Sequence, residues 1–422
     1  MAPHADRLRG AMNIGLMRKV DYWCGIPLAT ALTLWCWVAG RFRRGTPLAG
    51  VRRVLFIELS EMGSAIIVDP VLKRVAERHE VYFLIFERNA ASLRIFNTVA
   101  EANTCTIREN SFFTLAWDTL RFVAWCRRHR IDAVVDLELF SRVTAILAAL
   151  SGASVRIGFH NPHSEGLYRG RILTHPVAYN PHIHIARNFV SLSDPLVHPD
   201  RYRDALNRRL IADGEVRLAR VQPPEAALEQ VRQILRRRIP ALARHQRLLL
   251  VNANAGDFLP QRKWPQGHFA RFVERFLERN AGVLVLLTGS PKERPEVEQI
   301  AARVNSPRCI NIAGDLKFQE LPALYALAEA LLTNDSGPAH FASAVGLRTY
   351  VLFGPETPAL YAPLDNCVPI YAGLACSPCV TAANHRNTPC QDNQCLKTIA
   401  PESVLETIQA YLDGPSPPQG GP

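Results

Sequence analysis

The sequence predicts an α/β protein with two doubly wound domains and a hydrophobic helix near its amino terminus. Apolar runs of strand length alternate with helical patterns in two successions of similar size, which is typical of parallel sheets covered by helices on both faces. A segment rich in proline and arginine separates the two successions. At 422 residues, the chain is long enough for two domains with substantial cores.

The amino-terminal segment 1–50 is basic and contains one hydrophobic stretch. Tyr22–Gly40 carries no charge over nineteen residues, with basic residues on both sides and three tryptophans within it. Its length barely reaches a bilayer span, and tryptophan collects at membrane interfaces. We therefore expect residues 22–40 to associate with a membrane, either spanning it or, kinked at Pro27, re-entering. The alternative is a helix packed on the first domain.

The first domain is expected over residues 51–212. Its apolar strands are predicted at Val54–Leu59, Val81–Phe86, Ile131–Leu137 and Ser154–Phe159, with one helix over Ala65–Val75. In such sheets, ligands bind beyond the carboxyl ends of the strands. The candidates there for holding an acceptor molecule are Gly63, Ser64, His160 and His163. For the two histidines, the more common alternative is a place in a solvent-exposed loop.

A linker is expected over 213–247 and the second domain over 248–400. Its strands are predicted at Leu248–Ala253, Val283–Thr288, Cys309–Ile312, 330–333 and Thr349–Phe353. Residues 401–412 are predicted to form a final helix and residues 413–422 a disordered tail.

The stretch Thr333–Leu364 carries the strongest functional pattern. A strand ends in Asn334–Pro338, where Gly337 allows a sharp bend and Pro338 suits a first helical turn. The free N–H groups of the helix that follows would suit a phosphate. Earlier, Arg262 and Lys263 follow the first strand of this domain. The alternative is an ordinary strand–helix turn beside surface cations.

The order Asp335-Ser336-Gly337-x-x-His340, then an alanine-rich helix and a strand ending Phe-Gly-Pro, resembles the donor-site signature of glycosyltransferase family 9. That family contains the lipopolysaccharide heptosyltransferases. The resemblance covers about Val51–Leu412. It implies two Rossmann-like domains facing a cleft, the GT-B type of glycosyltransferase, with the final helix crossing back to the first domain.

The same resemblance implies an inverting, metal-independent enzyme at the cytoplasmic side of the inner membrane. It would move a sugar, such as heptose, from a nucleotide-diphospho-sugar to a membrane glycolipid, such as a lipopolysaccharide core. No cofactor is required beyond this donor. In family terms, the donor pocket is lined by Arg262, Lys263, Glu293, Asp335, Ser336, Gly337 and His340. Cations and helix-terminal N–H groups would stabilise the charge of the departing diphosphate. For Glu293, which would hold ribose or base, the alternative is an ordinary acid at a helix start.

The catalytic base departs from the family pattern. The family places an aspartate after a Met-Gly pair, but Ser64 follows Gly63 here. A serine hydroxyl cannot take up a proton at neutral pH without help, whereas a carboxylate can. Glu61 is the nearest replacement and our candidate base; its alternative role is an exposed turn carboxylate. The missing aspartate also leaves open a non-catalytic protein that binds a nucleotide sugar or scaffolds a membrane assembly.

Charge and cysteine content set further expectations. The formal net charge of +11 suits anionic partners, but no nucleic-acid-binding module is recognisable. The lack of G-x-G-x-x-G after either first strand argues against an NAD-linked enzyme. Four cysteines in the loop 376–395 could hold structural zinc, with reduced thiols packing the loop as the alternative that we favour: Cys376, Cys379, Cys390 and Cys395.

Overall fold

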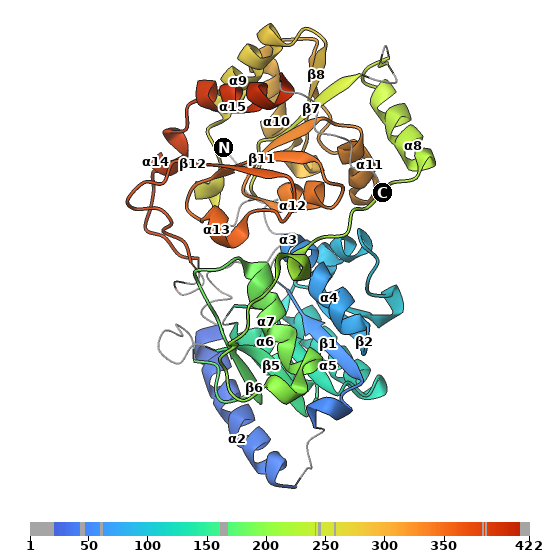
Figure 1. Cartoon of the computed structure of the whole chain (residues 1–422), viewed down its shortest axis with the longest axis vertical. Helices are drawn as coiled ribbons and strands as arrows, with labels where there is room; N and C mark the ends of the chain where they lie inside the picture. The colour runs from blue at the N-terminus through green and yellow to red at the C-terminus, as the bar shows by residue number, and fades with distance from the viewer. Residues whose placement is uncertain are drawn as a thin grey trace, which may run out of the picture. The chain divides into compact units, whose positions relative to one another are not determined.

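The chain divides into two compact units, which we describe separately (Figure 1). The first comprises Met1–Arg217 with Ala382–Arg386, and the second Leu218–Thr381 with Asn387–Pro422. The computed structural model describes residues 21–42, 47–59, 62–139, 141–160, 168–240, 242–243, 246–256, 259–381, 384 and 386–413.

The first unit contains a six-stranded parallel sheet in the order β3-β2-β1-β4-β5-β6. The strands are β1 (Arg53–Ile57), β2 (Glu80–Phe86), β3 (Thr104–Ile107), β4 (Ala133–Asp136), β5 (Val155–His160) and β6 (His175–Ala178). The order reverses between β1 and β4, whose register pairs Ile57 with Asp136. Such a reversal opens a crevice at the carboxyl ends of the two strands, where ligands of doubly wound sheets bind.

Helices cover both faces of this sheet. On one face, α5 (Phe112–Arg128) and α6 (Arg142–Leu150) share a buried cluster with β1, β2 and β4. α4 (Asp69–Ala76) and α7 (Ile185–Val197) pack together. The prediction of one helix over Ala65–Val75 is wrong, because the chain forms α3 (Met62–Ile67) and then α4. Pro70 lacks an N–H group and fits only the first turn of a helix, so α4 begins there afresh.

The second unit repeats the same topology. Its parallel sheet has the order β12-β11-β10-β7-β8-β9, so the reversal lies between β7 and β10. The strands are β7 (Arg247–Asn252), β8 (Val283–Leu287), β9 (Cys309–Asn311), β10 (Ala330–Asn334), β11 (Arg348–Phe353) and β12 (Cys367–Tyr371). The centres of β7, β8, β10 and β11 are almost fully buried, as two-sided helix cover requires.

The final helix, α15 (Pro401–Leu412), belongs to the second unit. Its buried residues Val404, Leu405 and Ile408 join the core formed by α9 (Gln266–Arg279), α10 (Arg294–Val304) and the sheet. The expectation that this helix crosses back to the first domain is therefore wrong. The apolar side chains of α15 pack against α9, where Phe272 and Phe276 are completely buried.

The predicted hydrophobic helix forms α2 (Ile26–Phe42), preceded by a short π-helical turn over Asp21–Gly25. Pro27 lies in its first turn, so the helix runs on without the re-entrant kink. One face packs on α6 and receives the Arg171 N–H at Thr33 Oγ1 (3.0 Å), while Trp35 and Trp37 on other faces are exposed. None of the helices in the described ranges is both long and apolar enough to cross a membrane.

Gly170 allows α2 to approach the loop before β6. Its φ is +70°, and a Cβ atom there would lie 2.1 Å from Thr33 Oγ1 and 2.9 Å from the Ala29 carbonyl oxygen. Gly152 has a similar φ of +79° but open space around it. We expect Gly170→Ala to lower the free energy of unfolding by about 1–3 kcal/mol more than Gly152→Ala does. Denaturant unfolding followed by circular dichroism measures the difference, and equal losses would contradict this docking.

Candidate functional site

The loops after β7 and β10 meet at the strand reversal of the second unit. Asn334, the fully buried last residue of β10, joins them through its side chain. Its Nδ2 donates to the Ala253 carbonyl at 2.9 Å, and its Oδ1 accepts the Trp264 N–H at 2.9 Å. Trp264 is itself buried and donates from Nε1 to the Ile399 carbonyl at 3.0 Å. The loop that carries the basic candidates is thus fixed beside the polar turn.

The two basic candidates on this loop extend toward different neighbours. Arg262 ends a 3₁₀ turn, Pro260–Arg262, and its side chain is only 12% exposed. Its Nη1 lies 3.7 Å from Oε2 of Glu356, a buried residue of the turn after β11, and its Nε has no hydrogen-bond partner among the described residues. Lys263 Nζ instead lies 3.6 Å from Oε2 of Glu296, in the first turn of α10. Of these two cations, Arg262 is therefore the one that lies beside the turn after β11.

The predicted donor turn lies at the end of β10 and opens α12 (Gly337–Ser343). Asp335 and His340 are buried, and the backbone of Ser336 is extended. The φ of Gly337 is not positive. A Cβ atom there would instead lie 3.2 Å from the ring of Phe341, so glycine allows the turn to sit close against that ring. These four candidates do come together.

Glu293 lies on the β8 side of the same sheet edge. Its Oε2 accepts the Ser290 N–H at 2.7 Å in a capping box, the ordinary role of an acid at a helix start. Asn254, which the sequence reasoning did not single out, is buried nearby, and its Nδ2 has no hydrogen-bond partner within the described part of the chain. A side chain at Gly289 would contact both groups. A ribose-binding role for Glu293 remains a prediction.

In the first unit, the candidates follow β1 and β5. Gly63 and Ser64 lie in α3, and His160 is the last residue of β5. Glu61 and His163 fall outside the described residues. A further loop histidine, His184, accepts the Ala186 N–H at its Nδ1 (3.1 Å) and caps α7.

The sequence reasoning missed two carboxylates at the strand reversal of the first unit. Glu138 lies just after β4, and its Oε1 accepts the Leu59 N–H at 2.9 Å. This bond fixes the chain directly after β1. Asp136 lies below it, fully buried, with Thr144 Oγ1 donating to its Oδ2 at 2.9 Å. Their position at the end of an apolar strand was the available signal, but the strand was read only as core.

Asp136 makes stability depend on pH. Burial raises the pKa of its carboxyl to about 7, against the partial opposition of Arg169 and Thr144; neighbouring Glu138 raises the pKa further. Because the ordinary pKa is 3.8, the folded chain binds a proton that the unfolded chain releases between about pH 4 and pH 7. This contribution to stability is complete below the lower pKa and is lost as the pH rises through the higher one.

We expect the free energy of unfolding to fall over this range relative to that of Asp136→Asn, which cannot titrate. Denaturant titrations at about pH 5 and about pH 8 measure the change, and a difference between the two proteins that does not vary with pH would contradict it.

The cysteine-rich loop supports the basic loop. Asn393 Nδ2 donates to the carbonyls of Gln261 (3.0 Å) and Lys263 (2.9 Å), and Gln261 Nε2 donates to the Cys390 carbonyl at 3.0 Å. None of the four cysteines of the loop is in a disulfide, and Cys395 is buried. In the ranges that the structure describes, no three His, Cys, Asp or Glu side chains are grouped so that they could hold a metal ion.

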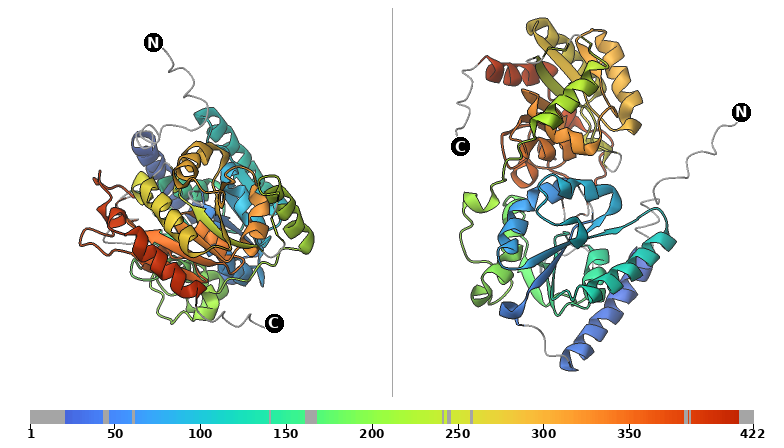
Figure 2. Two further views of the ribbon diagram at one scale, coloured as in Figure 1. Left: turned by 90° about the horizontal axis from the view of Figure 1, so that it is seen from above. Right: turned by 90° about the vertical axis from the view of Figure 1, so that its right-hand side faces the viewer.

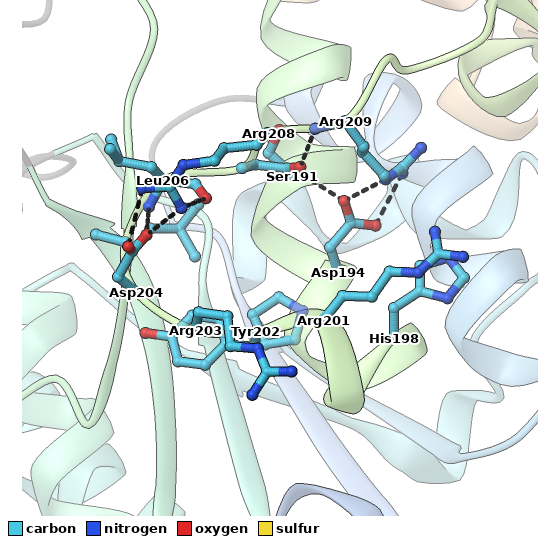
Figure 3. A pocket seen from close by; sticks show the side chains of 14 residues that line it. Ser191, Asp194, His198, Arg201, Tyr202, Arg203, Asp204, Leu206, Arg208 and Arg209 are labelled. Carbon is cyan, nitrogen blue, oxygen red and sulfur yellow. Dashed lines mark hydrogen bonds and ion pairs between the residues drawn. The ribbon is translucent and has the colours of Figure 1, made fainter.

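A cavity of about 250 Å³ lies in the first unit at the carboxyl end of α7, away from the carboxyl ends of the strands (Figure 3). It is lined by several arginines, two of which are bound to carboxylates. Arg209 contacts both oxygens of Asp194 at 2.7 and 2.8 Å, and Arg208 contacts both oxygens of Asp204 at 2.9 Å. These pairs hold the segment after α7 in place, so we do not assign the site to this cavity.

Comparisons with known proteins identify the family of the chain. The family model described as glycosyltransferase family 9 (heptosyltransferase) matches residues 120–388. Lipopolysaccharide heptosyltransferase 2 of Salmonella typhimurium is 29% identical over 174 residues, covering 40% of this chain and 47% of that protein. Lipooligosaccharide heptosyltransferase 2 of Haemophilus influenzae is 34% identical over 113 residues, covering 26% and 32%. The chain thus spans less than half the length of these curated relatives.

Solved structures share the fold. The E. coli ADP-heptose lipopolysaccharide heptosyltransferase II superposes with a TM-score of 0.63 at 20% identity, covering 85% of this chain and 98% of that one. A family 9 glycosyl transferase of Veillonella parvula also gives 0.63, at 17% identity, covering 85% and 96%. An E. coli heptosyltransferase solved with ADP gives 0.56 at 13% identity, covering 85% and 99%.

Proposed function

The chain belongs to glycosyltransferase family 9 (heptosyltransferase), and from this premise we propose that it transfers a sugar from a nucleotide-diphospho-sugar to a membrane glycolipid. We propose heptose as the sugar, ADP as the nucleotide and a lipopolysaccharide core as the acceptor. The names of the relatives support these choices, since they are lipopolysaccharide or lipooligosaccharide heptosyltransferases, one of them solved with ADP.

One observation carries the proposal. The buried side chain of Asn334 ties the loop of Arg262 to the turn Asp335–His340 at the strand reversal of the second unit. A parallel sheet offers its ligand site at this position. Arg262 is largely buried there, and within the described residues its neighbouring carboxylate, Glu356, stands 3.7 Å away, beyond hydrogen-bonding distance. A guanidinium in such a position suits the two oxygens of a phosphate.

The reaction follows from these groups. A carboxylate of the first unit, for which we keep Glu61, takes the proton from an acceptor hydroxyl. The hydroxyl oxygen attacks the anomeric carbon from the face opposite the nucleotide, so the configuration inverts. The bond to the nucleoside diphosphate breaks, and both of its electrons leave with the diphosphate. Arg262 and the N–H group of Gly337 then stabilise the added negative charge, which is why we propose that no metal ion is needed.

The acceptor and the helix α2 suggest where the protein works. A lipopolysaccharide core is built on a membrane lipid, and α2 exposes Trp35 and Trp37 on the faces that do not pack on α6. We propose attachment to the cytoplasmic side of the inner membrane through residues 22–40.

The test is transfer of radiolabelled sugar from ADP-heptose, and from other nucleotide sugars, to a purified lipopolysaccharide-core glycolipid. We expect transfer from ADP-heptose that persists when a chelator is present. Tight donor binding without transfer to any acceptor would favour the non-catalytic alternative, which Ser64 in place of the family's aspartate keeps open. If the chain binds no nucleotide sugar at all, both the transferase proposal and the non-catalytic alternative are wrong.

A further inference from the structure

The exposed hydrophobic side chains are unevenly distributed over the chain. Among the described residues, fifteen large hydrophobic side chains are exposed, and all fifteen belong to the first unit. Twelve of them lie on α5, α6 or the segment 22–38, and a thirteenth, Tyr168, contacts Thr30 of α2. Scattered exposed apolar residues are normal, but a set concentrated on neighbouring helices marks an interaction surface.

The helix α5 is apolar on two opposite faces. Phe122 and Cys126 are buried in the core of the first unit. On the outer face, Phe113 is 90% exposed, Trp117 61% and Leu120 65%. Their spacing of four and three residues aligns them in one stripe about 10 Å long. This stripe is not needed for the core, because the other face already supplies it.

The outer faces of α5, α6 and α2 lie on the same side of the first unit. α5 and α6 cover the same face of the sheet, since both contribute to one buried cluster, and α2 packs on α6. Figure 2 shows α2 lying lengthwise along this side of the unit. Val143 of α6 is exposed as well. The three helices together therefore form one apolar surface.

The charge on this surface has one sign. The sole acid within α5, Asp118, is fully buried and paired with Arg108 at 2.9 Å and with Arg121 at 3.3 Å. Arg121 is still 64% exposed, and Arg127 and Arg128 are exposed at the end of the helix. α2 contains no acid either. Exposed aromatic groups bordered by arginine, with no exposed acid, fit the interface of an anionic lipid bilayer.

We propose that α5, together with α6 and α2, forms a surface that binds the anionic face of a lipid bilayer. The stripe of Phe113, Trp117 and Leu120 enters the headgroup layer, and the arginines bind lipid phosphates. α5 begins at the carboxyl edge of the sheet, where Ser64 and His160 lie, so this contact would bring that edge to the membrane. The choice of a lipid-borne acceptor rests on the proposed function, but the binding itself does not.

The experiment is vesicle flotation of the full chain at increasing lipid concentration, without donor or acceptor. The variant Phe113→Ser/Trp117→Ser/Leu120→Ser is compared with Leu206→Ser/Leu210→Ser, which removes exposed leucines near the cavity of Figure 3. On phosphatidylethanolamine–phosphatidylglycerol vesicles, we expect the α5 variant to bind at least about tenfold more weakly and the control to bind like wild type. Arg127→Gln/Arg128→Gln should weaken binding to these vesicles but not to phosphatidylcholine alone.

Two results would overturn the proposal. The first is flotation of the α5 variant equal to that of wild type. The second is a change in molar mass by light scattering with unchanged flotation, which would make the stripe a contact between two copies of the chain. Circular dichroism checks the fold, which these exposed residues should not affect. If the wild-type chain floats with the vesicles but transfers no sugar, the result counts against the proposed function and not against this surface.

Discussion

Replacing Arg262 with glutamine is expected to lower kcat for sugar transfer by about a hundredfold to a thousandfold. The guanidinium would stabilise the negative charge that develops on the departing diphosphate. Its position is fixed because its loop is bonded through Asn334 and Trp264. Because the Arg262 side chain is largely buried, water in the variant could not take over its interaction with the diphosphate. Initial rates at saturating donor and acceptor measure the effect.

Lys263→Gln is the matched control for this prediction, because it removes a neighbouring positive charge on the same loop. Lys263 Nζ faces Glu296 of α10, so we expect a loss below about tenfold, in line with a partly exposed ion pair. Arg262→Lys should retain part of the activity, since it keeps the charge but not the two-pronged geometry. Equal losses for Arg262→Gln and Lys263→Gln would contradict the assignment of Arg262.

Glu61→Gln is expected to lower kcat by about a hundredfold to ten thousandfold, the usual range for a general base. The amide keeps the size of the side chain but cannot take up the proton of the acceptor hydroxyl. The acidic limb of the kcat/KM profile should disappear with the carboxylate. In this background, Ser64→Asp should restore transfer, because it returns an acid to the position where the family carries its base.

Glu138→Gln is the control for the base assignment. Glu138 Oε1 already accepts the Leu59 N–H, and an amide oxygen can make the same bond. We therefore expect Glu138→Gln to stay within about tenfold of wild type, and Glu138→Ala to lose more because the end of β1 is then no longer fixed. If Glu138→Gln abolishes transfer while Glu61→Gln does not, Glu138 is the base and our assignment is wrong.

The central strands of both sheets could be predicted from the sequence, whereas most edge strands could not. β1, β4, β7 and β10 are buried on both faces and therefore appear as continuous apolar runs. β3, β6 and β12 lie at sheet edges, and most of their residues are only partly buried. Pro176 and Pro369 stand inside two of them, as edge strands allow and central strands do not. Only the short edge strand β9 was predicted.

In the candidate site, too, local patterns could be predicted from the sequence, whereas contacts between residues far apart in the chain could not. The turn Asp335–His340 and the loop of Arg262 each carry a local pattern, and the structure brings both to one strand reversal. The bonds that join them could not be predicted, because Asn334 pairs with Trp264 across seventy positions in the chain. The same holds for Glu138, which reaches Leu59. Such pairs follow from sheet order, which local patterns do not specify.

A crystal structure of the full chain with a bound nucleotide sugar tests the central claim most directly. We expect the diphosphate oxygens to lie within hydrogen-bonding distance of the Arg262 guanidinium and of the backbone N–H group of Gly337. A diphosphate bound elsewhere, with Arg262 still directed only at Glu356, would contradict the account.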